Sequence, residues 1–152
     1  MSEKIISDRR LDSWRLFITL YPKLIERIDA ELQAAGQLSL PQYDVLIELF
    51  ETDKKRLRMF ELAQRVVLSR SSITRLTDQL TLQGMLTRET DPADRRGSYA
   101  VLTEAGETAL KNAWPIYREA ILRQFGQFLS EEEAQILVQV FSRLHEALDA
   151  AN

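Results

Sequence analysis

Two groups of arginine residues, the first accompanied by short hydroxyl side chains, have the chemistry needed to bind a nucleic acid. The first group consists of Arg70, Ser71, Thr74 and Arg75. Hydroxyl and guanidinium groups donate hydrogen bonds to phosphate oxygens, and a bidentate arginine also recognises the O6 and N7 atoms of guanine. The second group, Arg95 and Arg96, lies in a turn that contains proline and glycine. The sequence therefore provides two candidate DNA-contact sites, which the surrounding elements must position.

The first group lies on the second helix of a predicted helix–turn–helix. Residues 59–66 have apolar side chains at helical spacing, and residues 67–69 form a connection too short for anything but a turn. Ser69 suits the N-cap of the second helix, because its hydroxyl accepts a free backbone N–H. We expect this helix to end at Gly84, since glycine readily takes the left-handed conformation found at helix ends.

The second helix has one apolar and one polar face. Ile73, Leu76 and Leu80 follow one another at spacings of three and four residues and so share a side. The opposite side carries Ser71, Thr74, Arg75 and Asp78. Short hydroxyls permit a close approach and arginine reaches phosphates or guanine edges, which is typical of a recognition helix in the major groove of DNA. The alternative interpretation is an ordinary solvated helix face.

The second group lies at the tip of a predicted hairpin. Residues 85–90 and 98–102 have strand-like patterns, and the segment between them is a polar turn that ends at Gly97. A brief strand around Leu57 is expected to pair with this hairpin. A helix–turn–helix followed by such a hairpin is a winged helix.

The residues of this winged helix resemble the MarR (multiple antibiotic resistance regulator) family. Asp94-Arg95-Arg96-Gly97, followed by Val101-Leu102-Thr103 and Gly106, is similar to the wing signature of that family, and ELAQRVVLSRSSITRLTDQL is similar to its helix–turn–helix. The resemblance covers nearly the whole chain and implies a dimeric transcriptional regulator, usually a repressor. It also implies that Asp94 orients the arginine that enters the minor groove; the alternative is that Asp94 and Arg96 only stiffen the turn. Met59 departs from the family pattern, because a serine or threonine usually caps the first helix of this motif.

Long helices are expected on both sides of the winged helix. Residues 8–35 carry apolar side chains at alternating spacings of three and four over three heptads, a seam for another helix. A second long helix is capped by Thr103 and is expected to run to about Phe128. Pro22 and Pro115 lie inside these two helices and are expected to kink them, since proline lacks a backbone donor.

Two capping boxes, which begin at Ser39 and Ser130, predict the start of two further helices. Together the first helix and the last two carry more apolar surface than a winged helix can cover. We therefore expect a homodimer in which the terminal helices of two chains interlock; the alternative is packing within one chain. A two-fold dimer binds palindromic half-sites about one DNA turn, ~34 Å, apart.

The predicted fold is mostly α, a winged helix-turn-helix with N- and C-terminal helices that form a dimerisation region. Residues 1–152 form one domain, in which residues 38–103 are the winged helix-turn-helix lobe. The dimerisation helices are expected at 8–36 and 104–149.

The net charge of −3 conceals an uneven distribution. Residues 54–96 contain ten Lys or Arg and five Asp or Glu, a local charge of +5, so the remaining residues carry −8. A basic lobe on an acidic body is expected of a DNA-binding protein, and the alternative is chance clustering on a solvated surface. The chain has no cysteine, no apolar run long enough to span a membrane and a polar N-terminus, which predicts a cytoplasmic protein.

The first two helices contain four candidates for lining an effector pocket: Trp14, Arg15, Tyr21 and Asp44. In the family that the chain resembles, many members release DNA when a small aromatic or phenolic acid binds between the dimer helices and the winged helix. The alternative is that these residues are core aromatics and a surface salt bridge. His145 is the only histidine, and a zinc site needs several nitrogen or sulfur ligands, so we expect no metal and no other cofactor.

These features together predict a sequence-specific DNA-binding transcriptional regulator. Its expected partners are double-stranded DNA and a second copy of the chain, and a small aromatic effector is a candidate ligand. Two alternatives are a winged-helix module for protein interaction and an architectural protein that binds DNA without sequence preference. The basic segment and the face of hydroxyls and arginine favour the regulator. An enzyme is not expected, because the sequence has no GxGxxG motif, no P-loop and no recognisable nucleophile–base constellation.

Overall fold

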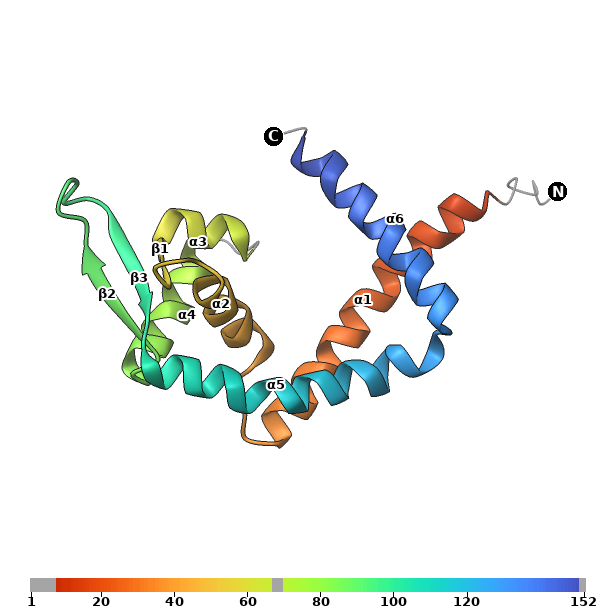
Figure 1. The fold of residues 1–152 in the computed structure, drawn as a ribbon, viewed down its shortest axis with the longest axis horizontal. Helices are drawn as coiled ribbons and strands as arrows, with labels where there is room; N and C mark the ends of the chain where they lie inside the picture. The colour runs from red at the N-terminus through yellow and green to blue at the C-terminus, as the bar shows by residue number, and fades with distance from the viewer. Residues whose placement is uncertain (1–7, 67–69, 151–152) are drawn as a thin grey trace.

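A computed structural model describes residues 8–66 and 70–150 of the chain. In chain order the elements are α1 (Arg9–Ala34), α2 (Leu40–Phe50), β1 (Arg56–Arg58), α3 (Met59–Arg65), α4 (Arg70–Leu82), β2 (Leu86–Thr90), β3 (Ser98–Leu102), α5 (Glu104–Gln124), a 3₁₀ turn η1 (Gly126–Phe128) and α6 (Glu131–Asp149). Figure 1 shows α2, α3, α4 and the three strands gathered at one end of α5, while α1 and α6 cross near its other end. The fold is the predicted one, a mostly helical winged helix with long flanking helices.

The three strands form one antiparallel sheet in the order β1-β3-β2. The predicted hairpin is confirmed, and so is the brief strand around Leu57, which lies opposite Ala100 of β3. Leu57, Ala100 and Leu86 are buried on one face of the sheet. Because side chains alternate along a strand, Arg58 and its cross-strand neighbour Tyr99 lie on the other face.

Local hydrogen bonds explain where the helices begin. Ser39 accepts from the backbone N–H of Gln42 at 3.4 Å, and the Gln42 side chain accepts in return from the Ser39 N–H at 3.0 Å. Ser130 and Glu133 form the same reciprocal pair at the start of α6, at 3.2 and 2.8 Å. Both predicted capping boxes are therefore confirmed, and each satisfies two backbone donors that a helix start leaves free.

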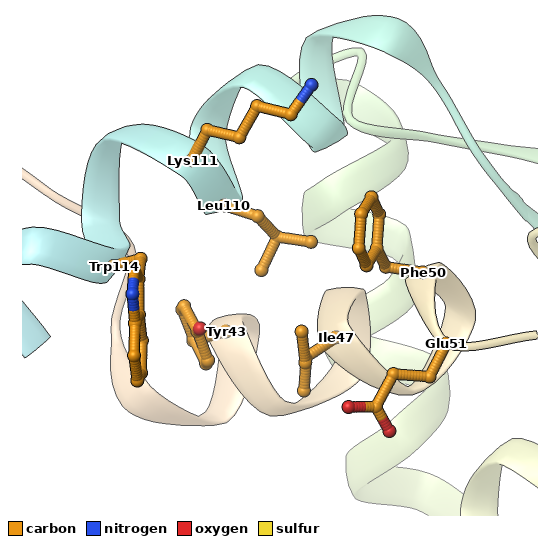
Figure 2. A pocket seen from close by; sticks show the side chains of 7 residues that line it. All are labelled: Tyr43, Ile47, Phe50, Glu51, Leu110, Lys111 and Trp114. Atoms are coloured by element: carbon orange, nitrogen blue, oxygen red, sulfur yellow. The ribbon is translucent and has the colours of Figure 1, made fainter. Parts of the chain in front are cut away.

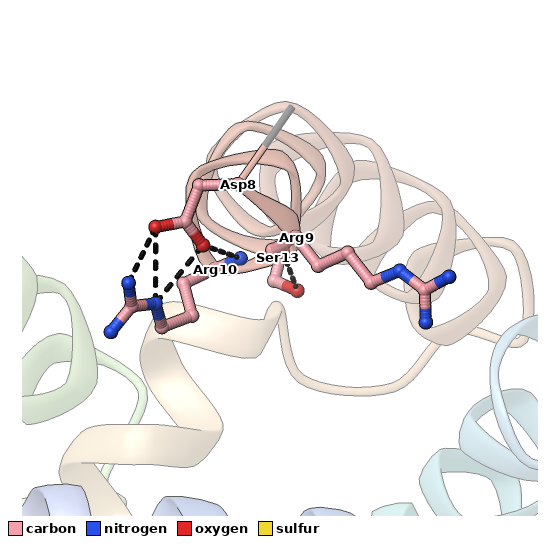
Figure 3. Close-up of polar contacts among 4 residues, drawn as sticks. All are labelled: Asp8, Arg9, Arg10 and Ser13. Carbon is pink, nitrogen blue, oxygen red and sulfur yellow. Dashed lines mark hydrogen bonds and ion pairs between the residues drawn. The ribbon is translucent and has the colours of Figure 1, made fainter. Parts of the chain in front are cut away.

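The N-terminus of α1 is closed by Asp8. Its carboxylate accepts from the Arg10 backbone N–H at 2.9 Å and pairs with the Arg10 guanidinium at 2.6 Å (Figure 3). One turn later the Ser13 hydroxyl donates to the Arg9 carbonyl at 2.7 Å. A negative charge at this position also suits the positive end of the helix dipole.

The start of α5 lies against the end of α4. Gly84 takes the predicted left-handed conformation, with φ of 75°. The Thr103 hydroxyl donates to the Gly84 carbonyl at 2.7 Å and also accepts from the Gly106 N–H at 3.1 Å. A Cβ at Gly106 would collide with the Met85 carbonyl, so this close approach requires glycine. The helix–turn–helix and α5 are consequently joined without space between them.

The two long helices, α1 and α5, both continue through their prolines, and the kinks expected there stay a prediction. Pro22 and Pro115 are both exposed, and each lies inside a helix that continues without a break. The extent of α5 was predicted wrongly, because the helix ends at Gln124 and is followed by η1. Phe125 has left the helical conformation, and Gly126, which is about 1 kcal/mol less favourable than alanine within a helix, follows it.

The hydrophobic core extends from Ile28 of α1 to Ala120 of α5. Within the described ranges, α6 buries no residue at all. The apolar seam of α1 is divided: Ile28 and Leu32 are buried, whereas its first half is exposed. The exposed apolar side chains of that half include Leu11, Trp14, Phe17, Ile18 and Tyr21. None of the helices in residues 8–66 and 70–150 combines the length and apolar character that crossing a membrane requires.

Candidate nucleic-acid interface

The two faces of α4 lie as the sequence predicts. Ile73 and Leu80 are buried against the lobe core. Three of the four residues predicted to contact DNA, Ser71, Thr74 and Arg75, are exposed on the opposite side. The fourth, Arg70, is the first residue of α4, and its side chain lies outside the described part of the chain, as does the predicted N-cap, Ser69.

An arginine of the wing fixes the position of α4. Arg88 of β2 donates to the hydroxyl of the buried Thr77 at 2.7 Å and pairs with Asp78 at 2.8 Å. The Thr77 hydroxyl donates in turn to the Ile73 carbonyl at 2.9 Å. Asp78, which shares the outer face of α4, is therefore occupied by a framework contact. No pattern in the sequence indicated this link between the recognition helix and the sheet.

The wing tip carries Arg95 and Arg96, both exposed. The Asp94 carboxylate accepts from the backbone N–H of Arg96 at 3.0 Å, and the Asp94 carbonyl accepts from the Gly97 N–H at 2.9 Å. No ion pair joins the side chains of Asp94 and Arg96, both of which are described. Asp94 thus supports the wing by shaping the backbone rather than by holding the guanidinium, because an aspartate readily bonds the N–H two residues on.

The root of the wing contains a buried carboxylate. Asp91 is 5% exposed, accepts from the Ala93 N–H at 2.9 Å and forms an ion pair with Arg58 at the end of β1. The Nε of Arg58 also donates to the Tyr99 hydroxyl at 3.3 Å. This hydrogen bond and the charge of Asp91 raise the pKa of the Arg58 guanidinium. Sequence reasoning missed this cluster.

Most basic side chains of the lobe have an acidic partner. Besides Arg58–Asp91, the pairs among the described residues are Lys55–Glu107 at 2.5 Å, Arg56–Glu89 at 3.6 Å, Arg65–Glu48 at 3.6 Å and Arg88–Asp78 at 2.8 Å. Arg75, Arg95 and Arg96 form no ion pair with any described residue. The uncompensated positive charge of these three residues therefore lies on α4 and on the wing tip.

A hollow of about 400 Å³ between α3, α4 and the wing brings the two predicted groups together. Its lining is Arg58, Met59, Phe60, Ala63, Ile73, Thr74, Arg96, Gly97 and Ser98. Thr74 of the first group and Arg96 of the second therefore face the same concave surface. Its lining combines polar side chains such as Arg58 and Thr74 with apolar ones such as Phe60 and Ile73.

Comparisons with known proteins identify the fold and the family. A family model described as MarR family matches residues 38–98. An HTH-type transcriptional regulator of Bacillus cereus, itself uncharacterized, is 32% identical over 108 residues, which cover 71% of this chain and 70% of that protein. The chain belongs to the MarR family of transcriptional regulators.

Solved structures agree with this assignment. Sco3205, a MarR family regulator from Streptomyces coelicolor crystallised in complex with DNA, is 27% identical with a TM-score of 0.81, over 96% of this chain and 92% of that one. BpsR of Bordetella bronchiseptica, whose DNA binding is regulated by 6-hydroxynicotinic acid, has a TM-score of 0.76 over 88% of this chain and 98% of that one. At 18% identity the second likeness concerns the fold alone.

One departure from the MarR family pattern has a structural explanation. Arg58, the residue before Met59, takes the N-cap position of α3 without a side-chain cap of its own. Instead, the Glu61 carboxylate accepts from the Arg58 N–H at 3.1 Å. Glu61 thus satisfies the N–H of the N-cap residue, and its negative charge suits the start of α3, but it does not replace the bond that a serine or threonine cap makes to the first turn.

The four candidate pocket residues come from two helices, and two of them, Tyr21 and Asp44, lie close enough to Tyr117 to contribute, after burial, to raising its pKa. Asp44 is half-buried on α2, where burial and the nearby charge of Glu48 raise its pKa to about 6. Trp14, Arg15 and Tyr21 are exposed on the first half of α1, and the ring of Trp14 lies 6.2 Å from that of Phe17.

A different cavity lies between α2 and α5. It has a volume of about 500 Å³ and is lined by Tyr43, Ile47, Phe50, Glu51, Leu110, Lys111 and Trp114 (Figure 2). Tyr43 packs edge-on against Tyr117 at a centroid distance of 4.9 Å, which fixes one wall. Lys111 and Glu51 supply one cationic and one anionic group, and the remaining lining is mostly apolar. Among the described residues, no three His, Cys, Asp or Glu side chains are placed to hold a metal ion.

Proposed function

We propose that this MarR-family chain is a sequence-specific DNA-binding repressor that acts as a homodimer on a palindromic operator. The observation that carries the proposal is the distribution of unpaired cations. Arg75, Arg95 and Arg96 are exposed without acidic partners among the described residues, while the other described arginines of the lobe and Lys55 are paired with carboxylates; Lys54, before β1, is the remaining exposed cation without an ion pair in this part of the structure. Unpaired arginines on one convex element and one projecting loop match the two grooves of a DNA duplex.

The two elements take different parts of the duplex. The first turns of α4, with Arg70, Ser71, Thr74 and Arg75, enter the major groove and contact bases and phosphates. The wing tip, with Arg95 and Arg96, enters the flanking minor groove, where a narrow A·T-rich segment concentrates negative potential. Asp94 keeps the tip in shape for that contact.

The dimer is inferred from apolar surface that the chain does not cover itself. Phe17 of α1 and Phe141 of α6 lie 5.9 Å apart between ring centroids, and both are more than two-fifths exposed. α6 also exposes Ile136, Val138, Leu144 and Leu148. Exposed patches of this size and continuity mark interaction sites. A two-fold assembly through residues 8–36 and 104–149 leaves the lobe of residues 38–103 free for DNA and sets two copies of α4 about one turn, ~34 Å, apart.

Release by a small aromatic acid is the regulatory part of the proposal. The cavity between α2 and α5 has a mostly apolar lining with Lys111 and Glu51 in it; the apolar side chains suit an aromatic ring and Lys111 suits its carboxylate, which must bind away from Glu51. BpsR, which shares the fold, is a case in which an acid of this class, 6-hydroxynicotinic acid, regulates DNA binding. Trp14, Arg15, Tyr21 and Asp44 remain a second candidate site, which the dimer would have to complete.

Selection of bound duplexes from a random pool tests the proposal directly. A palindromic consensus is the expected result for the dimeric regulator. Binding without a consensus would favour an architectural DNA-binding protein, and absence of binding would favour a module for protein interaction. Repeating the selection with Arg75→Ala shows whether the consensus depends on α4.

A further inference from the structure

At the wing root, the side chain of Arg58 connects the start of α3 to the wing loop and to β3. Arg58 is the last residue of β1 and the N-cap of α3, so its backbone belongs to the start of the helix–turn–helix. Its guanidinium forms the ion pair with Asp91 at the start of the wing loop and donates to Tyr99 of β3 at 3.3 Å. Movement of the wing relative to α3 must therefore break at least one of these contacts.

The aromatic ring of Tyr99 holds this arginine in place. Arg58 and Tyr99 are directly opposite each other in the β1–β3 register. The Arg58 guanidinium carbon lies 5.5 Å from the ring centroid, and that of Arg56 lies 4.5 Å from it. A planar guanidinium stacked on an aromatic ring has already lost much of its rotamer freedom. Arg58 is therefore presented to Asp91 in a fixed orientation.

Asp91 in turn fixes the loop that carries Arg96. Its N–H donates to the Gly97 carbonyl at 3.0 Å, and its carboxylate accepts from the Ala93 N–H at 2.9 Å. The Nη1 of Arg58 lies 3.8 Å from the position that a Cβ of residue 97 would occupy. The residue next to Arg96 is thus in contact with the cluster, although Asp91 itself is five residues away from Arg96 along the chain.

We propose that Arg58 and Asp91 are positioning residues that set the angle between the wing and α4, so that Arg96 and the recognition helix meet the duplex together. This inference rests on the proposed DNA-binding function. Asp91 is too buried to touch DNA, so its effect on binding acts through other residues.

Electrostatics alone gives the opposite expectation for one substitution. Asp91→Asn removes a negative charge from the lobe and leaves Arg58 unpaired, which by charge alone strengthens binding to a polyanion. The positioning role requires that the same substitution weakens binding. Glu48→Gln is the matched control, because it removes a carboxylate from an arginine pair of the same lobe, Arg65–Glu48 at 3.6 Å, away from the wing.

The experiment measures operator affinity for wild type, Asp91→Asn, Arg96→Ala and the double variant, on two operators that differ only in the A·T content of their flanks. We expect Asp91→Asn to weaken binding to the A·T-rich operator about tenfold, within the range found for coupled residues. It should add nothing in the Arg96→Ala background, and Glu48→Gln should bind at least as tightly as wild type. Melting temperature and dimer mass are compared for every variant.

Two outcomes overturn the positioning role while leaving the proposed function intact. One is a loss with Arg96→Ala but none with Asp91→Asn, and the other is additive losses in the double variant. Unchanged binding for both single variants overturns the wing contact itself. If Asp91→Asn does not fold, Arg58→Lys replaces it, because lysine keeps the charge but cannot contact Asp91 and Tyr99 with a planar fork.

A spectroscopic measurement separates positioning from stability. Since the chain has no cysteine, Arg95→Cys gives one nitroxide attachment site per chain at the wing tip. Asp91→Asn should add a more mobile component to its electron paramagnetic resonance spectrum, and Glu48→Gln should leave the spectrum unchanged. Identical spectra for the labelled parent and its Asp91→Asn variant would overturn the proposal.

Discussion

The winged lobe differs from the outer helices, which are α6 and the first half of α1, in how its apolar side chains are covered. Every buried hydrophobic side chain of the described chain belongs to residues 28–120, whereas the outer helices contain none. Both regions have amphipathic helices with an apolar stripe. In the lobe that stripe meets a sheet or another helix of the same chain. In the outer helices the apolar side chains stay exposed, and the aromatic ones contact each other in a row: Trp14 contacts Phe17, and Phe17 contacts Phe141.

Both situations occur within α1, where one continuous apolar seam is buried in its second half and exposed in its first half. Ile28 and Leu32 pack under α5, and the N-terminal half continues the same spacing without cover. An apolar pattern therefore predicts that a face will be buried, but it does not identify the chain that buries it. We expect the stability of the lobe to depend on its own core, and burial of the apolar side chains of the outer helices to depend on a second copy of the chain.

The largest effect is expected from breaking the outer surface with Phe141→Glu. Light scattering at micromolar concentration should change from about twice the 17.6 kDa chain mass to that of one chain, because a charge is placed where an apolar interface is proposed. Operator affinity should fall about 100-fold or more, since the two lobes then bind independently. Leu82→Glu, at an apolar position 89% exposed in the lobe, should leave the mass unchanged. A two-chain mass for Phe141→Glu would refute the proposed interface.

The core of the lobe is tested by Leu46→Ala. Leu46 is fully buried, so the free energy of unfolding should fall by about 2–5 kcal/mol through lost contacts and a cavity. Urea unfolding of both proteins at one concentration measures this change, because dimer stability depends on concentration. The mass of the native protein should remain that of wild type. A change below about 1 kcal/mol would mean that the site collapses around the smaller residue.

The exposed cations of the lobe should affect binding without affecting stability. Arg75→Ala is expected to weaken operator binding by about 1–3 kcal/mol if the arginine contacts a base. A phosphate contact would instead give a similar loss on all sequences and a flatter dependence on salt. Fluorescence anisotropy at several salt concentrations distinguishes the two, and the melting temperature should not change. Arg75 lies outside the interface if every duplex binds as tightly as before.

The smallest effect is expected at Asp44. Burial and the charge of Glu48 raise the pKa of Asp44 from 3.8 to about 6, and the rings of Tyr43 and Tyr117 are the other titratable groups near it. Its contribution to stability is therefore fully present below about pH 3.8 and is lost as the pH rises through 6. Asp44→Asn should be more stable than wild type above pH 6.5 by about 1 kcal/mol, reduced from ~3 kcal/mol because the carboxylate is partly solvated.

Thermal unfolding of the two proteins between about pH 2.5 and pH 8 measures this difference, because the range must extend below the unfolded pKa of 3.8. The two curves should converge at the acidic end, where Asp44 is protonated in both the folded and the unfolded state. A constant difference across the range would show that the carboxylate does not titrate in the folded protein as stated.

Features that depend on neighbouring residues were accessible from the sequence. The capping boxes at Ser39 and Ser130 and the turn at Gly84 each follow from contacts within four residues. The hairpin follows from two strand-like segments around a polar turn, and the strand around Leu57 was expected as the usual third strand of a winged helix. Thr74 and Arg96 were chosen separately, and the winged-helix pattern was enough to place them at one surface.

Contacts between distant residues were not accessible in this way. Arg58 and Asp91 are 33 residues apart, and an aspartate that begins a polar turn after a strand is ordinarily solvated. Arg88 likewise has no local pattern that would indicate its bonds to α4. The role of Asp94 was assigned to the Arg96 side chain because sequence spacing does not distinguish a guanidinium from a backbone N–H two residues on.

Because of the close contact at Gly106, rotation of α5 at one end displaces α4 at the other. One end of this 21-residue helix is fixed to the end of α4, and the other is tied to α1 by Arg123–Glu31 at 3.0 Å. At 1.5 Å per residue the rod is roughly 30 Å long, so a rotation of about 5° at the α1 end moves the α4 end by about 3 Å. That displacement is the length of a hydrogen bond. A small change of angle among the outer helices is thus enough to misalign α4 with a groove while every element stays folded.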